Sequence, residues 1–253
     1  MQEISSASNE KFKYFRSLLT KKGRDESGRY LVEGIKSVND ALDSSSAVEA
    51  LIIRNNLDYT PKDFEGTVYS MPPALADRLS DTKTPQGVFA VIKKQCSDSF
   101  CLKPDGAYVY CDRISDPGNL GTIIRTADSA GFDGVLLSAG CVEVYNPKTI
   151  RSSMGSIFHI DVFEDKNANV PEQFIENGGK VYGGILSEDT MDYRSADYTG
   201  GIMIVVGNEA NGISEEIKKL CCAIKIPIYG KAESLNAAVA GSIMMYQAAN
   251  SRN

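Results

Sequence analysis

The chain has a single histidine, His159, among its 253 residues. Any mechanism that needs a histidine-based triad or several histidine metal ligands must therefore use that one side chain. His159 lies in the apolar run 157–160, and we interpret it as a structural residue. The six cysteines form no CxxC pair and no cluster with histidine, which favours free thiols in a reducing compartment over a disulfide framework. We predict no metal site.

Long apolar runs are absent as well. No segment approaches the roughly 18 consecutive apolar residues of a membrane-spanning helix. The first 15 residues lack the apolar core of a signal peptide. The sequence therefore predicts a cytoplasmic protein that has no part in a membrane.

Excess positive charge is also lacking, because the net charge is −6. This disfavours a broad, non-specific nucleic-acid binder, since such proteins are usually basic. The first 100 residues are balanced in charge, so the excess negative charge lies in the rest of the chain. Basic side chains nevertheless gather between Lys11 and Arg29, where they fit either a contact with a phosphate backbone or a solvated helix face.

Strand and helix patterns alternate through the first 96 residues, which predicts a small α/β domain. The predicted helices are 8–22, 34–42 and 72–79, and the first of them is predicted to break at 22–24. The predicted strands are 29–33, 47–54, 67–70 and 87–93. Residues 97–105 contain several turn formers and are predicted to be a linker.

A second domain is predicted over residues 106–253. Its strands are nearly continuous apolar runs and alternate with helices, which is typical of a parallel sheet covered on both faces. The predicted strands are 107–111, 134–138, 157–163, 180–186, 201–206 and a short one that ends at 226–228. The predicted helices are 119–130, 147–153, 171–177, 214–220 and one that starts near Ser234.

The helix predicted at 119–130 has a regular core stripe. Leu120, Ile123, Ile124 and Ala127 share one face, and Arg125 points well away from it. Arg125 therefore faces either water or a second surface.

Two loops follow predicted strands in this second domain, where small ligands of open α/β sheets bind. The loop 207–212 resembles a dinucleotide fingerprint, but Glu209 replaces its central glycine and would repel a pyrophosphate. This disfavours a nucleotide-dependent oxidoreductase. The other segment, 225–247, runs from strand to helix with Ser234 as its predicted N-cap, and when it is considered alone an ordinary strand-loop-helix is the favoured interpretation.

Three blocks of sequence lie at these strand ends and helix starts: 116–127 (DPGNLGTIIRTA), 207–214 (GNEANGIS) and 226–240 (IPIYGKAESLNAAVA). In order and spacing they resemble the three motifs of the SpoU (TrmH) family of RNA ribose 2′-O-methyltransferases, in the SPOUT class. Residues 30–34, 84–88 and 151–155 are also similar to the family, so the resemblance covers nearly the whole chain. The departures are mild: Ala210 replaces a frequent glycine, Ile228 a methionine, and Ala237-Ala238 a Val-Ser pair.

The resemblance implies a SPOUT domain with a deep trefoil knot, a homodimer with the active site at its interface, and an N-terminal RNA-binding domain. It implies transfer of a methyl group from S-adenosylmethionine to a ribose 2′-OH of a structured RNA, with ribosomal RNA favoured over transfer RNA. A housekeeping role and a drug-resistance role both stay open. The alternative is a non-catalytic RNA-binding or ribosome-assembly factor that keeps the fold.

The resemblance also implies roles for individual residues. The expected catalytic residues are Arg125, Asn119, Glu209, Ser234 and Asn236. Arg125 either activates the hydroxyl or positions the RNA phosphate, since a guanidinium is a poor general base. The expected cofactor contacts come from Gly207, Ile226, Ile228, Leu235 and Leu186, and the expected RNA contacts from Lys21, Lys22, Arg24 and Arg151.

Overall fold

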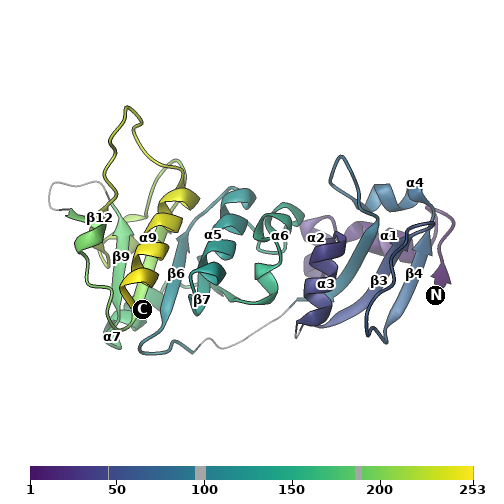
Figure 1. Ribbon diagram of the computed structural model, residues 1–253, viewed down its shortest axis with the longest axis horizontal. Coiled ribbons are helices and arrows are strands. Elements are labelled where there is room, and N and C mark those ends of the chain that lie inside the picture. The colour runs from purple at the N-terminus through teal and green to yellow at the C-terminus, as the bar shows by residue number, and fades with distance from the viewer. Residues whose placement is uncertain (45, 95–100, 186–189, 253) are drawn as a thin grey trace. The chain divides into compact units, whose positions relative to one another are not determined.

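The computed structural model describes residues 1–44, 46–94, 101–185 and 190–252, and many of its elements are labelled in Figure 1. The chain divides into two compact units. Unit 1 comprises Met1–Cys96 and Tyr145–Phe158, and unit 2 comprises Ser97–Val144 and His159–Asn253. Among the described residues, the helices all fall short of the length and apolar character that crossing a membrane requires.

Unit 1 is built on a five-stranded mixed sheet of order β1-β4-β3-β5-β2. Its strands are β1 (Gln2–Glu3), β2 (Arg29–Glu33), β3 (Val48–Arg54), β4 (Thr67–Met71) and β5 (Val88–Lys93). Its helices are α1 (Glu10–Ser17), α2 (Lys21–Ser27), α3 (Ile35–Asp43), α4 (Pro73–Ala76), η1 (Asp77–Leu79), α6 (Pro147–Ser153) and η2 (Ser156–Phe158). The predicted α/β character of this part is confirmed, and β1 is an addition that the sequence did not predict.

Helices pack on both faces of this sheet. Because side chains alternate along a strand, Leu31 of β2 contributes to one face and Val32 to the other. The first face packs against Phe12 and Phe15 of α1. The second packs against α3 and also buries Ile150 of α6.

The segment Tyr145–Phe158 joins unit 1 through aromatic contacts as well. The rings of Tyr30 and Tyr145 stack with their centroids 4.4 Å apart. The Lys94 ammonium lies 5.5 Å from the centroid of the Tyr145 ring. The predicted helix over 147–153 is confirmed, and it contributes to the core of the N-terminal sheet.

The predicted break at 22–24 is wrong, because the helix ends earlier. α1 ends at Ser17, and Thr20 caps α2 by accepting a hydrogen bond from the Gly23 amide at 3.2 Å. Gly23 lies inside α2, where an added Cβ atom would meet the Ser17 carbonyl oxygen at 2.2 Å. This glycine therefore permits two helices to approach closely and does not interrupt one.

The predicted RNA contact of Arg24 is also wrong. Only 3% of Arg24 is exposed, and its Nη1 donates a hydrogen bond to the Leu18 carbonyl at 2.9 Å. The side chain satisfies a backbone group at the end of α1, so it cannot reach an RNA phosphate.

Unit 2 is built on a seven-stranded sheet of order β10-β12-β9-β11-β6-β7-β8. Its strands are β6 (Ala107–Asp112), β7 (Gly134–Ser138), β8 (Asp161–Asp165), β9 (Lys180–Gly184), β10 (Met191–Asp192), β11 (Ile202–Gly207) and β12 (Cys222–Lys225). Its helices are α5 (Pro117–Ser129), α7 (Val170–Glu176), η3 (Tyr193–Ser195), α8 (Glu215–Lys218) and α9 (Ala237–Arg252). All pairings between these described strands are parallel, which confirms the predicted sheet.

Both faces of the parallel sheet are covered. On one face, Tyr108 and Met203 pack with Phe174 of α7 and Ile217 of α8. On the other, α5 and α9 lie side by side (Figure 1). An added Cβ atom at Gly241 would meet the Val206 side chain at 2.8 Å, so the small residues of α9 allow it to lie close to β11. The knot at this end of the chain stays a prediction.

Three local predictions after residue 156 are wrong. The strand predicted at 157–163 begins only at Asp161, because Ser156–Phe158 form the short helix η2. His159 lies between them and is exposed, so it is not a buried structural residue. The segment 226–228 lies after β12, which ends at Lys225.

The Arg24 contact predicts a stability effect. Replacing Arg24 with alanine leaves the Leu18 carbonyl buried without this donor, so the free energy of unfolding should fall by about 1–3 kcal/mol in urea denaturation. The control Lys21→Ala, on the same helix but exposed, should change it by about 0.5 kcal/mol or less. An Arg24→Ala protein as stable as the wild type would contradict a structural role.

Candidate active site

The three sequence blocks meet at one edge of the unit 2 sheet. The first follows β6, the second follows β11, and the third follows β12. β11 pairs directly with β6 and with β9, and β9 pairs with β12. Because all these strands are parallel, their carboxyl ends lie at the same edge.

Glu209 binds the loop after β6. Its Oε2 accepts hydrogen bonds from the Ser115 amide at 3.2 Å and from the Ser115 hydroxyl at 2.8 Å. Its Oε1 accepts from the Asp116 amide at 3.2 Å and from Asn119 Nδ2 at 2.8 Å. This carboxylate therefore joins the second block to the first.

Asn119 and Asn236 extend the same network to the third block. Asn236 Nδ2 donates to Asn119 Oδ1 at 3.0 Å. The other amide atom, Asn236 Oδ1, accepts from the backbone amides of Ala238 and Val239 at 3.0 and 3.2 Å. Asn236 is therefore the cap of α9, and the prediction that Ser234 is the cap is wrong. Ser234 is exposed in the loop two residues earlier.

The Glu209 carboxyl is held in its ionised form. Its partial burial alone would raise its pKa, but hydrogen bonds from Asn119, from backbone amides and from Ser115 outweigh burial and lower the pKa to about 2. An ionised carboxylate at this position can only accept hydrogen bonds. It can therefore hold several donors from two loops at once.

A second layer of polar contacts supports these loops, and the sequence did not single it out. The buried Asp112 accepts hydrogen bonds from the Ser214 amide at 2.5 Å and from the Ser138 hydroxyl at 3.3 Å. Asn208 Nδ2 donates to the Arg113 carbonyl at 2.8 Å. Arg113 itself has a φ of 57°, which a non-glycine residue rarely adopts. The sequence did offer one indication of these contacts, because Asp112 is a charged residue at the end of an apolar, buried strand.

Arg125 lies on α5 with its side chain exposed, as its position outside the core stripe predicted. The four stripe residues of that helix are fully buried. Among the residues that the structure describes, the Arg125 guanidinium makes no ion pair, and it is not part of the Glu209–Asn119–Asn236 network. One turn of α5 is joined to α9 beside it, because the Thr126 and Ser242 hydroxyls lie 3.0 Å apart.

The expected cofactor residues lie on the second and third loops. An added Cβ atom at Gly207 would meet the Gly212 carbonyl carbon at 2.4 Å, so this loop requires glycine there. Ile226 and Leu235 are half-buried and Ile228 is 38% exposed. Leu186 lies outside the described residues. Within the described part of the chain, the backbone between 227 and 235 makes no hydrogen bond to other backbone groups.

The remaining residues with expected RNA contacts lie in unit 1. Lys21 and Lys22 are exposed on α2, with Lys22 Nζ 3.7 Å from Glu26. Arg151 on α6 is half-buried and forms an ion pair with Asp81.

Comparison with known proteins places the chain in a family. A model of the SpoU rRNA methylase family matches residues 106–246, and a model of the MRM3-like substrate binding domain matches residues 9–90. The chain belongs to the SpoU rRNA methylase family. It is 34% identical over 255 residues to the 23S rRNA (guanosine(2553)-2′-O)-methyltransferase RlmP of Bacillus subtilis (strain 168), with 97% of this chain and 98% of that protein covered.

Solved structures show the same fold. The SpoU methyltransferase AviRb from Streptomyces viridochromogenes, in complex with the cofactor AdoMet, matches with a TM-score of 0.86 and 27% identity over 96% of this chain and 97% of that chain. The AdoMet-bound rRNA methyltransferase from Sinorhizobium meliloti matches with a TM-score of 0.85 and 31% identity, over 98% and 97% of the two chains. The expected two-part α/β fold is therefore confirmed.

The low pKa of Glu209 predicts a pH-dependent contribution to stability. A carboxyl with a depressed folded pKa stabilises the protein above its unfolded pKa of about 4.3, and this contribution is lost as the pH falls towards about 2. Glu209→Gln should lower the free energy of unfolding at pH 7, and its difference from the wild type should shrink between pH 5 and pH 3 in urea denaturation.

A matched control for this experiment is Glu216→Gln, which removes an exposed carboxylate from α8. It should unfold like the wild type at each pH. A difference between Glu209→Gln and the wild type that stays constant from pH 7 to pH 3 would reject the ionised network.

Proposed function

We propose that this protein transfers a methyl group from S-adenosylmethionine to a ribose 2′-OH of ribosomal RNA. The observation that carries the proposal is the hydrogen-bonded network Glu209–Asn119–Asn236, which unites the three family blocks at one sheet edge. The names of the relatives support the substrate, since two of them are 23S rRNA 2′-O-methyltransferases. The AdoMet-bound neighbours support the cofactor.

The chain's own residues fit such a cofactor. The loop between 227 and 235 offers backbone donors and acceptors without internal partners among the described residues, and these suit the edge of an adenine ring. We propose that Gly207, Ile226, Ile228 and Leu235 hold it, and Leu186 is kept as a further candidate outside the described residues. When bound, S-adenosylmethionine supplies an electrophilic methyl group, so the protein's task is positioning.

Arg125 is proposed to contact the RNA at the reacting nucleotide. Its guanidinium is exposed and offers several donors in a plane, which suits a phosphate beside the 2′-OH. Asn119, Glu209 and Asn236 fix the start of α5, the helix that carries Arg125, and the exposed Ser234 is proposed to contact the ribose.

The three parts of the chain have different proposed roles. We propose that residues 1–96 bind RNA, that 97–105 link the domains, and that 106–253 carry methyl transfer, threaded as a trefoil knot. The match of the substrate-binding family model to residues 9–90 supports the first part. We further propose that the protein works in the cytoplasm, where ribosomal RNA of bacteria is found.

Arg125→Ala tests the proposed reaction. This variant should lower the rate of methyl transfer from radiolabelled S-adenosylmethionine to an unmodified 23S rRNA transcript by about a hundredfold or more, because a charge that positions the reacting group is lost. Cofactor binding, measured by calorimetry, should stay at the wild-type level.

Ser129→Ala, which changes an exposed residue one turn further along α5, is the matched control and should methylate like the wild type. If the wild-type protein binds RNA but does not bind S-adenosylmethionine and transfers no methyl group, the non-catalytic alternative is supported. If Arg125→Ala methylates at a near wild-type rate, only the role proposed for Arg125 is rejected, and methyl transfer by the protein is not.

We propose that the protein is a homodimer with its active site at the interface. An apolar stripe on α9 supports this proposal. Val239 is 46% and Tyr246 47% exposed, and Ile243, half-buried, lies between them at helical spacing. A two-fold dimer can bury such a stripe against the same stripe of a second copy.

Tyr246→Glu should disrupt this dimer, because it places a charge in the apolar stripe. Light scattering should give the mass of a monomer, and methyl transfer should be lost. The control Lys219→Glu also adds negative charge to unit 2, at the end of α8, and should stay dimeric. A wild-type protein that is monomeric at micromolar concentration would contradict the proposal.

A further inference from the structure

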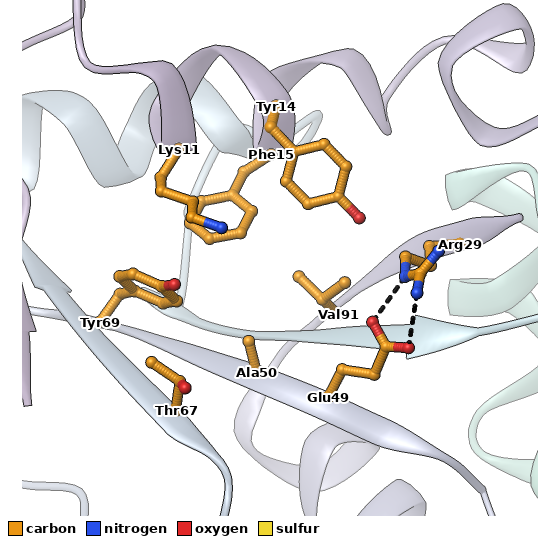
Figure 2. Close-up of a pocket in the computed structure, with 9 residues that line it drawn as sticks. All are labelled: Lys11, Tyr14, Phe15, Arg29, Glu49, Ala50, Thr67, Tyr69 and Val91. Atoms are coloured by element: carbon orange, nitrogen blue, oxygen red, sulfur yellow. Dashed lines mark hydrogen bonds and ion pairs between the residues drawn. The ribbon is translucent and has the colours of Figure 1, made fainter. Parts of the chain in front are cut away.

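Unit 1 carries a pocket of about 380 Å³ between α1 and the sheet, which the proposed reaction does not use. Figure 2 shows its walls. Tyr14 descends from α1 on one side, and Tyr69 of β4 forms the opposite side. The Lys11 ammonium points into the space between them.

Aromatic rings form the apolar part of this pocket. Phe15 and Tyr69 are buried, with their ring centroids 5.1 Å apart in an edge-to-face arrangement. The Tyr14 ring is half-buried, and its centroid lies 5.6 Å from that of Phe15. Phe15 therefore fixes the Tyr14 and Tyr69 rings from behind and leaves the Tyr14 ring partly free to stack with a ligand.

The rim of the pocket is polar and already ordered. Arg29 Nε lies 2.5 Å from Glu49 Oε2, and Arg29 Nη2 lies 2.9 Å from Glu49 Oε1. Arg29 Nη1 also donates to the Ser27 carbonyl at 2.6 Å. These contacts fix both side chains of the pair, so the N–H donors of the guanidinium that are still unused have a defined direction. Among the described residues Lys11 makes no ion pair, which leaves its charge available to an anion.

We propose that this pocket binds one unpaired nucleotide of the substrate RNA, with the base against Tyr14, the phosphate at Lys11 and the base edge at the Arg29–Glu49 pair. This inference rests on the proposed function. Proteins recognise unpaired bases by stacking them on aromatic rings and by hydrogen bonds to their edges. A pocket of this volume has room for a flat ring with an attached phosphate.

The polar rim favours a nucleotide over an apolar protein side chain. An apolar group in the pocket would remove Lys11, Arg29 and Glu49 from water without replacing their hydrogen bonds, and such burial is costly. A nucleotide has both an apolar face and hydrogen-bonding edges. It also carries the negative charge that Lys11 can neutralise.

Matched variants of α1 test the proposal with the full-length protein and an unmodified 23S rRNA transcript. Lys11→Gln and Tyr14→Ala should each weaken RNA binding by about tenfold. Tyr14→Phe keeps the ring and should bind like the wild type. Lys13→Gln removes the same charge from the same helix, but Lys13 pairs with Glu10 outside the pocket, so it should also bind nearly like the wild type.

Steady-state methylation provides a second measurement. The pocket variants should raise KM for RNA and leave kcat unchanged. Calorimetry with S-adenosylmethionine should match the wild type, which shows that unit 2 is intact, and an unchanged unfolding curve in urea shows that unit 1 folds as well. A third measurement needs no variant. A transcript containing 4-thiouridine should cross-link to the peptides that contain Tyr14 or Tyr69.

If Lys11→Gln and Lys13→Gln lose RNA affinity equally, the proposal is overturned, because equal losses would reflect a diffuse attraction between the RNA and the positive charges of α1. If Tyr14→Ala has an unchanged KM for RNA while the wild-type protein methylates normally, the proposed nucleotide binding in this pocket is overturned and the proposed function is left intact. A wild-type protein that transfers no methyl group to the transcript would overturn the proposed function itself.

Discussion

The arrangement of the candidate active site depends on one carboxylate that accepts hydrogen bonds from two separate loops. A carboxylate has about four acceptor positions, and Glu209 uses them for the Ser115 amide and hydroxyl, the Asp116 amide and Asn119. Its pKa of about 2 also makes it a weak proton acceptor at neutral pH. Glu209 is therefore suited to hold the loop and the start of α5 in place, and it is not suited to remove a proton from a ribose hydroxyl.

This carboxylate also determines which way the asparagines face. Because Glu209 can only accept, Asn119 must direct its amide nitrogen towards it, and the Asn119 oxygen is then left to accept from Asn236. The nitrogen of Asn236 is used in turn, so its oxygen is the atom that caps α9. An aspartate at position 119 would place two carboxylates in contact. The chemistry of one residue thus fixes the amide orientation of two others across three loops.

The sequence predicts what depends on local pattern and misses what depends on distant contacts. Short apolar runs predicted the strands, and the spacing of residues on α5 placed Arg125 outside the core. Ser234 and Asn236 are both good N-caps, and only the side-chain oxygen Oδ1 of Asn119, far away in the chain, selects Asn236. Glycine is a residue type that often breaks helices, but Gly23 lies inside α2 and is needed there because the Ser17 backbone is so close. The two-residue strand β1 is too short to produce a periodic signal.

The net charge of −6 limits how the protein can bind the proposed RNA substrate. A protein that repels phosphates overall cannot rely on diffuse attraction, so its affinity must come from a few well-placed contacts. The basic segment of unit 1 is less available than its composition indicates, since Arg24 is buried and Arg29 is paired with Glu49. What remains is a small number of cations, such as Lys11 beside the Tyr14 ring. Stacking adds binding energy that does not depend on charge and weakens little with salt. An acidic methyltransferase therefore gains more from an aromatic pocket than from additional lysines.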